Sequence, residues 1–169
     1  FCFSYWPAAC AETILEVNVE GLTGPALENV RKLLSIEQQK TDPNLFEARI
    51  RRLHRNAPAE IKQALEPFGY YEPTIEARLT QPTPGHWLAS YTIDPGMAVR
   101  VAGIDLKLTG EGVNDDQFQM LVSNFPLHEG DTLDHARYEA GKRAFLTAAS
   151  ENGYRDAKLL VHEIRVQPE

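Results

Sequence analysis

The sequence predicts an α+β fold built from two tandem β-α-α-β-β units, each a small mixed sheet covered by helices. Three observations lead to this prediction. Short stretches alternate apolar and polar residues, as half-buried strands do. Longer stretches between them carry apolar residues at helical spacing. The same order of elements then occurs a second time along the chain, and 169 residues are enough for two such units.

The composition is that of a folded protein with excess negative charge. Hydrophobic residues make up 43% of the chain and charged residues 24%, and the formal net charge is -7. This acidity argues against a general binder of nucleic acids or other polyanions. The only strongly apolar stretch, residues 1–11, has about half the length that a membrane-spanning helix needs.

Residues 1–11 resemble the end of a secretory signal peptide without its amino-terminal part. The segment is apolar and aromatic, it closes with an Ala-Cys-Ala sequence that fits a cleavage site, and the chain turns polar at Glu12. We therefore expect export; a tag-like tail is the alternative. Both cysteines, Cys2 and Cys10, lie in this segment, so the rest of the chain uses neither disulfides nor thiol chemistry.

The first unit is expected over residues 12–95, and alternation predicts its three strands. The first is Ile14–Leu22, with its odd-numbered residues from 15 to 19 buried. The second follows Gly69 and runs from Tyr71 to Thr80. A turn rich in proline and glycine leads into the returning strand, whose buried positions are expected to be Trp87, Ala89, Tyr91 and Ile93.

Three helices are predicted between the first two strands. The first begins at Gly24-Pro25, the second begins at Asp42-Pro43 and breaks at Pro58, and the third ends at Gly69, which suits a left-handed C-cap. Their apolar stripes are expected to be Leu27, Val30, Leu33 and Leu34, then Phe46, Ile50 and Leu53, and last Ile61, Ala64, Leu65 and Phe68.

The second unit is expected over residues 96–169. A strand is predicted at Val99–Leu108, followed by a helix that Asp115 and Asp116 lead and a second helix that Thr132 caps and that runs to about residue 150. The closing strand is predicted at Ala157–Val166. Gly153-Tyr154 repeats Gly69-Tyr70, and at the same offset matching apolar positions flank both pairs, which indicates duplication of one unit.

These residues resemble polypeptide-transport-associated (POTRA) domains. The resemblance is carried by a helix that ends in Gly-Tyr, then an acidic residue, a strand, a returning strand and Pro-Gly, as found over Gly69–Glu76 and Asp94–Gly96. Within the family, Val17–Leu22 and the Gly-Tyr-Tyr-x-Pro-Thr-Ile-Glu run are similar to the first and second modules of TamA-type outer-membrane subunits. The POTRA region of a BamA-like or two-partner-secretion transporter is the alternative within the same fold.

The resemblance implies protein interaction rather than catalysis, with no cofactor, on the periplasmic side of the outer membrane. It implies an inner-membrane-anchored TamB-like partner, and client outer-membrane or autotransporter polypeptides. It also implies that the parent chain continues into a third POTRA domain and a β-barrel. Because the sequence stops at Glu169, after the last predicted strand, the second unit is expected to lack its returning strand and to complete its sheet by self-association.

The first candidate site is an edge strand. In POTRA domains the second strand lies at the sheet edge, where strand addition by another polypeptide is the plausible mode of binding. The outward Glu76 and Arg78 could equally guard this edge against unwanted pairing. The candidate residues are Thr74, Ile75, Glu76, Ala77, Arg78, Leu79 and Thr80.

The second candidate site is a basic run, in which Arg51, Arg52 and Arg55 stand outside the apolar stripe of the helix that carries them. It is either a solvated helix face or a docking patch for an acidic partner or anionic lipid headgroups. A rival of another class is a small periplasmic metal-dependent enzyme that uses the loop from His128 to His135. No paired metal-ligand motif or nucleotide-binding motif supports that rival.

Overall fold

A computed structural model describes residues 13–160 and 164. The chain divides into two compact units. The first contains the residues up to Ala64 together with Pro73–Pro95, and the second contains Leu65–Glu72 together with the residues from Gly96 onward. The expected signal-peptide remnant at residues 1–11 lies outside the described residues.

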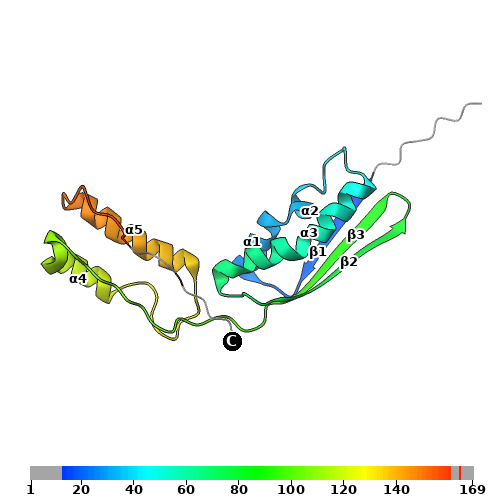
Figure 1. Cartoon of the computed structure of the whole chain (residues 1–169). Coiled ribbons are helices and arrows are strands. Elements are labelled where there is room, and N and C mark those ends of the chain that lie inside the picture. The colour runs from blue at the N-terminus through cyan, green and yellow to red at the C-terminus, as the bar shows by residue number, and fades with distance from the viewer. Residues whose placement is uncertain (1–12, 161–163, 165–169) are drawn as a thin grey trace, which may run out of the picture. The chain divides into compact units, whose positions relative to one another are not determined.

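The first unit contains a three-stranded sheet with the order β1-β3-β2. Its strands are β1 (Ile14–Glu20), β2 (Thr74–Thr83) and β3 (His86–Asp94). β1 runs parallel to β3, and β2 pairs with β3 as an antiparallel hairpin that turns at Pro84-Gly85 (Figure 1). This mixed sheet and the helices beside it confirm the α+β class.

The alternation seen in the sequence places the core on one face of this sheet. Trp87, Ala89, Tyr91 and Ile93 of the central strand β3 are all buried, and so are Leu15 and Val19 of β1. The residues between them point to the opposite, polar face. Because the core-facing residues of both strands are buried on the same side of the sheet, the helices cover β1 and β3.

The helices of this region are α1 (Gly24–Leu33), the short α2 (Ser35–Gln38) and α3 (Glu47–Leu65), and η1 (Glu66–Phe68) is a final 3-10 turn that ends at Gly69. Gly69 has the expected left-handed backbone, with φ +83°. The expectation of a break at Pro58 is wrong, because α3 passes through it.

The reason lies in the apolar stripe on either side of Pro58. Its members continue at spacings of three and four across the proline and are all buried: Ile50, Leu53, Ala57, Ile61, Ala64 and Leu65. Burial of this stripe offsets the proline penalty of about 3 kcal/mol. Three other expectations are also wrong. Leu33 and Phe46, each expected in a buried stripe, are exposed, and α3 begins at Glu47 rather than at Asp42.

The second unit contains η2 (Glu111–Asn114), α4 (Asp116–Ser123) and α5 (His135–Glu151). Asp115 caps α4 as expected, whereas α5 is capped by Asp134 rather than by Thr132. Asp134 accepts hydrogen bonds from the backbone N–H groups of Ala136 (2.8 Å) and Arg137 (3.1 Å). Thr132 instead forms an isolated bridge with Arg100.

The predicted strand at Val99–Leu108 is wrong, because the described structure has only that one bridge there. A strand needs a continuous partner for its backbone N–H and C=O groups, and the described part of this unit offers only Gly69 and Gly130–Leu133. Residues 157–160 are not a strand either, and most of the remaining predicted strand lies outside the described residues.

Candidate functional site

The seven candidate residues Thr74–Thr80 lie on β2, which is an edge strand of the described sheet. One side of β2 is paired with β3 throughout this stretch. The other side presents its backbone groups without a neighbouring strand among the described residues (Figure 1). An edge of this kind can take up one more strand.

The helix-facing side of β2 is only partly covered. Three β2 residues face the core side, where Ile75 is opposite Ile93, Ala77 opposite Tyr91 and Leu79 opposite Ala89. Their three partners on β3 are buried, whereas Ile75 and Leu79 are half-buried and Ala77 is exposed. The helical layer therefore ends above β3 and leaves apolar surface open along β2.

Contacts of α3 show which of its sides borders this opening. The guanidinium carbon of Arg51 lies 5.0 Å from the ring centroid of Trp87, and His54 Nδ1 lies 2.9 Å from the Tyr91 hydroxyl. The opposite side of α3 packs on the α2 region, where Glu60 accepts hydrogen bonds from both the backbone and the hydroxyl of Ser35 (2.7 and 2.8 Å).

The two sides of α3 therefore have different neighbours. Because α1 and α2 adjoin the Glu60 side and the core residues of β1 are buried, the Arg51 and His54 side points toward the uncovered strand β2. We call the surface formed by Ile75, Ala77 and Leu79 on β2, together with the side of α3 nearest to it, the β2 groove. The two candidate sites are one strand apart, because α3 contacts β3 and β3 pairs with β2.

The three arginines of the basic run are not equivalent. Arg51 forms an ion pair with Glu47 (2.8 Å) in addition to its contact with Trp87. Arg52 and Arg55 are exposed and form no ion pair or hydrogen bond with any residue that the structure describes. Arg55 stands one helical turn after Arg51 on the same side of α3, so its charge is available at the β2 groove.

His54 and the buried Tyr91 form a polar pair between α3 and β3. Burial lowers the pKa of His54 below its usual 6.5, and burial together with the negative charge of Glu60 raises the pKa of Tyr91. Both groups are therefore neutral at pH 7. The sequence analysis did not select this pair. It could have been found because His54 directly follows Leu53 of the buried helical stripe, and Tyr91 is one of the alternating buried residues of β3.

The outer face of the sheet is polar. Glu76 and Arg78 line a shallow hollow of about 270 Å³ on the side away from the helices, together with Asn18, Glu20, Ser90 and Thr92. Their outward direction agrees with the alternation in the sequence. Neither side chain projects into the β2 groove, because alternate residues of a strand face opposite sides.

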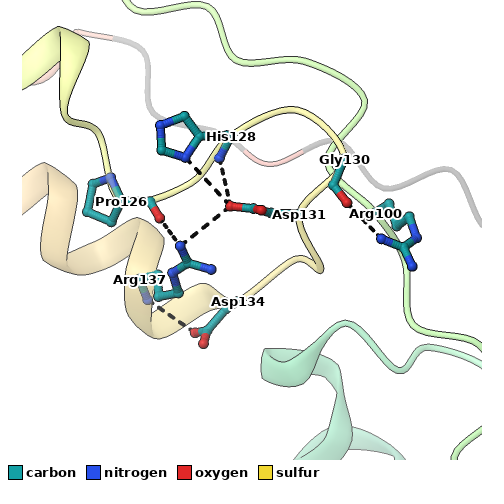
Figure 2. Close-up of polar contacts among 7 residues, drawn as sticks. All are labelled: Arg100, Pro126, His128, Gly130, Asp131, Asp134 and Arg137. Carbon is teal, nitrogen blue, oxygen red and sulfur yellow. Dashed lines mark hydrogen bonds and ion pairs between the residues drawn. The ribbon is translucent and has the colours of Figure 1, made fainter.

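The loop from His128 to His135 is a structural connection (Figure 2). Asp131 accepts a hydrogen bond from the backbone N–H of His128 (3.0 Å) and lies 3.4 Å from the Arg137 guanidinium. Arg137 also donates to the Pro126 carbonyl, and Arg100 donates to that of Gly130 (2.8 Å). These contacts tie the start of α5 to the preceding chain.

The two histidines of this loop are used separately. The imidazole of His128 lies 3.7 Å from Asp131, whereas His135 Nε2 lies 2.9 Å from the Tyr71 hydroxyl. Within the part of the chain that the structure describes, no three His, Cys, Asp or Glu side chains are grouped so that they could hold a metal ion. The described loop therefore offers no support for the metal-dependent enzyme.

A family model described as POTRA domain TamA domain 1 matches residues 16–95. These residues form a domain most like a POTRA domain of the TamA type. The match covers most of β1, all of β2 and β3, and both candidate sites. The POTRA domain of this chain thus contains every residue that the site requires.

Among solved structures, the chain is similar to the crystal structure of Haemophilus influenzae BamA POTRA3-5, with a TM-score of 0.42 and 18% sequence identity. The alignment covers 85% of this chain and 51% of that one, so the chain spans about half the length of the solved relative. Among the residues that the structure describes, no helix is both long enough and apolar enough to cross a membrane.

Proposed function

We propose that this chain is a protein-interaction module on the periplasmic side of an outer-membrane protein assembly or translocation machine of the TamA type, and that it is not an enzyme. The observation that carries the proposal is the β2 groove. It contains an edge strand with incompletely buried apolar residues, in a region that matches a TamA-type POTRA domain. An extended segment of another polypeptide binds there by strand addition.

Strand addition at β2 uses two sources of free energy. The backbone of the incoming segment pairs with the open N–H and C=O groups of β2. Its alternate side chains then pack on Ile75, Ala77 and Leu79. The opposite edge strand, β1, is a poorer acceptor, because its core-facing Leu15 and Val19 are already covered and leave no apolar surface for a further strand.

The partners follow from the type of machine. We propose an inner-membrane-anchored TamB-like protein as the docking partner, and unfolded outer-membrane or autotransporter polypeptides as clients. Residues 96–169 are proposed to be a second POTRA unit of the same chain, and a third unit and β-barrel to belong to the parent protein. The export signal proposed for residues 1–11 is consistent with this location.

Two neighbouring proline substitutions test the strand addition. In an antiparallel strand, successive N–H groups point alternately toward β3 and toward the free edge. Of Glu76→Pro and Ala77→Pro, one therefore removes a ladder bond and destabilises the sheet, whereas the other removes only a free-edge donor. The second variant is identified by a urea midpoint close to wild type, monitored by Trp87 fluorescence in a Trp6→Phe background.

Binding is then measured with the purified periplasmic part of a TamB-like protein and the full parent chain. We expect the stable proline variant to weaken binding at least tenfold, because it interrupts the added ladder. Asn18→Pro, on the opposite edge, is the matched control and should retain binding if it remains folded. Unchanged binding by the stable β2 variant would refute strand addition at β2.

The second unit carries a separate proposal about self-association. A hollow of about 380 Å³ in this unit is lined by polar residues and by apolar ones, of which Phe125 and Leu127 are buried and Ile104 is exposed. We propose that the isolated chain covers the exposed apolar part of this hollow with a second copy at high concentration. Light scattering should show a mass that rises with concentration. A monomer with Phe125 still buried at the highest concentration would exclude it.

The alternative within the same fold is the POTRA region of a BamA-like or two-partner-secretion transporter. To distinguish the two functions, the binding assay is repeated with the partners of those transporters in place of the TamB-like protein. For the metal-dependent enzyme, we expect His128→Ala to change neither metal content nor partner binding.

A further inference from the structure

Resting on the proposed strand addition, we infer that the β2 groove selects a segment with the pattern apolar-x-acidic-x-apolar. The two apolar side chains pack beside Ile75 and Leu79. The central carboxylate lies beside Ala77 and reaches the guanidinium of Arg55. The groove thus has a charge preference as well as an apolar one.

The sizes and spacing of the core-facing residues of β2 determine this pattern. The three core-facing residues of β2 are one large, one small and one large: Leu79, Ala77 and Ile75. A directly opposed residue on an added strand lies about 5 Å away, so each core-facing residue has one counterpart. The exposed Ala77 leaves space above it that Ile75 and Leu79 do not leave, and the central side chain can extend there toward α3.

The level of Ala77 is also the level of the basic turn of α3. Ala77 pairs with Tyr91, and Tyr91 is hydrogen-bonded to His54, the residue next to Arg55. The end of β3 that carries Trp87 contacts Arg51. The turn of α3 at the central level is therefore the one that carries Arg55, whereas Arg51 lies toward the Trp87 end.

Those charges are largely uncompensated. Glu47 pairs with Arg51, but Arg55 has no partner among the described residues, and Lys62 follows two turns later on the same side of the helix. The remaining acid of α3 near its middle, Glu60, is engaged with Ser35 on the opposite side. A carboxylate at the centre of the added strand therefore meets a net positive field.

The outer face does not provide the same preference. Side chains of an added strand that point away from the helices lie beside Glu76 and Arg78, whose opposite charges alternate along β2. A charge of either sign meets one favourable and one unfavourable neighbour there. Selection for an acidic residue therefore comes from the helix side alone, and it applies to one position rather than to the net charge of the segment.

The test uses three synthetic peptides that differ only at the central position of Leu-Thr-x-Thr-Leu, where x is Glu, Gln or Lys, within identical flanking residues. Binding to the chain is measured by fluorescence anisotropy, and the site is located from amide chemical shifts of residues 74–80. We expect the Glu peptide to bind about three- to tenfold more tightly than the Gln peptide, and the difference to shrink in 0.5 M salt.

Charge variants connect the preference to one side chain. Arg55→Gln should abolish the difference between the Glu and Gln peptides, and Arg55→Glu should make the Lys peptide the tightest. Arg31→Glu on α1, an exposed arginine away from the groove, is the matched control and should leave the order unchanged. Urea midpoints near wild type for all three variants show that they are folded.

Three outcomes distinguish a failure of the acidic preference from a failure of the proposed strand addition. Equal binding of the three peptides, with shifts confined to β2, refutes the acidic preference and leaves strand addition intact. The absence of any shift on β2 with all peptides refutes strand addition itself. Binding to phosphatidylglycerol vesicles that Arg55→Gln abolishes, without a peptide preference, assigns the arginines to lipid headgroups and overturns the inference.

Discussion

Replacing Gly21 by alanine should destabilise the first unit far more than the same change at Gly24. Gly21 follows β1 with φ +91°, and a Cβ there would lie 1.9 Å from the carbonyl oxygen of Ile93. Gly24 also has a left-handed backbone, with φ +58°, but a Cβ there meets nothing within 4 Å. The two substitutions share the backbone strain and differ in the steric overlap.

The expected magnitudes follow from these two contributions. A non-glycine residue in the left-handed region costs about 1–2 kcal/mol, which applies to both variants. At Gly21 a real Cβ must stay at least 3.0 Å from the backbone of Ile93, so the ends of β1 and β3 must separate. Loss of a backbone hydrogen bond and loosened packing of the buried Ile93 add about 2–3 kcal/mol.

The assay is urea unfolding monitored by the fluorescence of Trp87, which is 3% exposed and belongs to the first unit, in a Trp6→Phe background. With a slope of about 1.5 kcal/mol per molar urea, Gly21→Ala should lower the midpoint by about 2–3 M and Gly24→Ala by about 1 M. Equal midpoints for the two variants would show that the close approach to Ile93 does not constrain this turn.

Three further predictions concern helix packing and pH. Gly141→Ala on α5 should destabilise the second unit by about 1–2 kcal/mol despite better helix propensity, because its Cβ would lie 2.3 Å from the Phe125 ring; adding Phe125→Leu should recover most of this in thermal unfolding. Pro58→Ala should raise the free energy of unfolding of the first unit by about 1–2 kcal/mol, since it restores a helical hydrogen bond; a lower midpoint would contradict this. Because the pKa of His54 lies below 6.5 in the folded state, the unfolded chain takes up this proton first, and stability should fall as the pH drops below 6.5. His54→Gln should flatten that decline between pH 7 and pH 5, and an unchanged profile would exclude His54 as its source.

The sequence predicted the sheet of the first unit closely. Trp87, Ala89, Tyr91 and Ile93 are buried as their alternation indicates, and Gly69 has the left-handed backbone expected of a C-cap. These features depend on period and on backbone sterics, which a short stretch of chain determines by itself. The orientation of Glu76 and Arg78 was predictable for the same reason.

Local signals failed where packing opposed them. Pro58 has the sequence of a helix break, yet α3 continues because its buried stripe extends on both sides of the proline. Val99–Leu108 has the alternation of a strand, yet the described residues around it supply only the bridge between Arg100 and Thr132. A helix satisfies its hydrogen bonds within itself, whereas a strand depends on a neighbour.

The sequence by itself determined the α+β class, the buried face of β3 and the two sets of candidate residues. Only the tertiary structure decided that these sets lie one strand apart. The position of β2 at the sheet edge follows from the pairing order, and the exposure of Ala77 follows from where the helices stop. That Arg55 stands beside the same groove depends on the rotation of α3, which Trp87 and Tyr91 set through contacts between residues distant in the sequence. Such contacts produce no periodic pattern in the sequence of a single chain, so the groove could not be predicted from its residues alone.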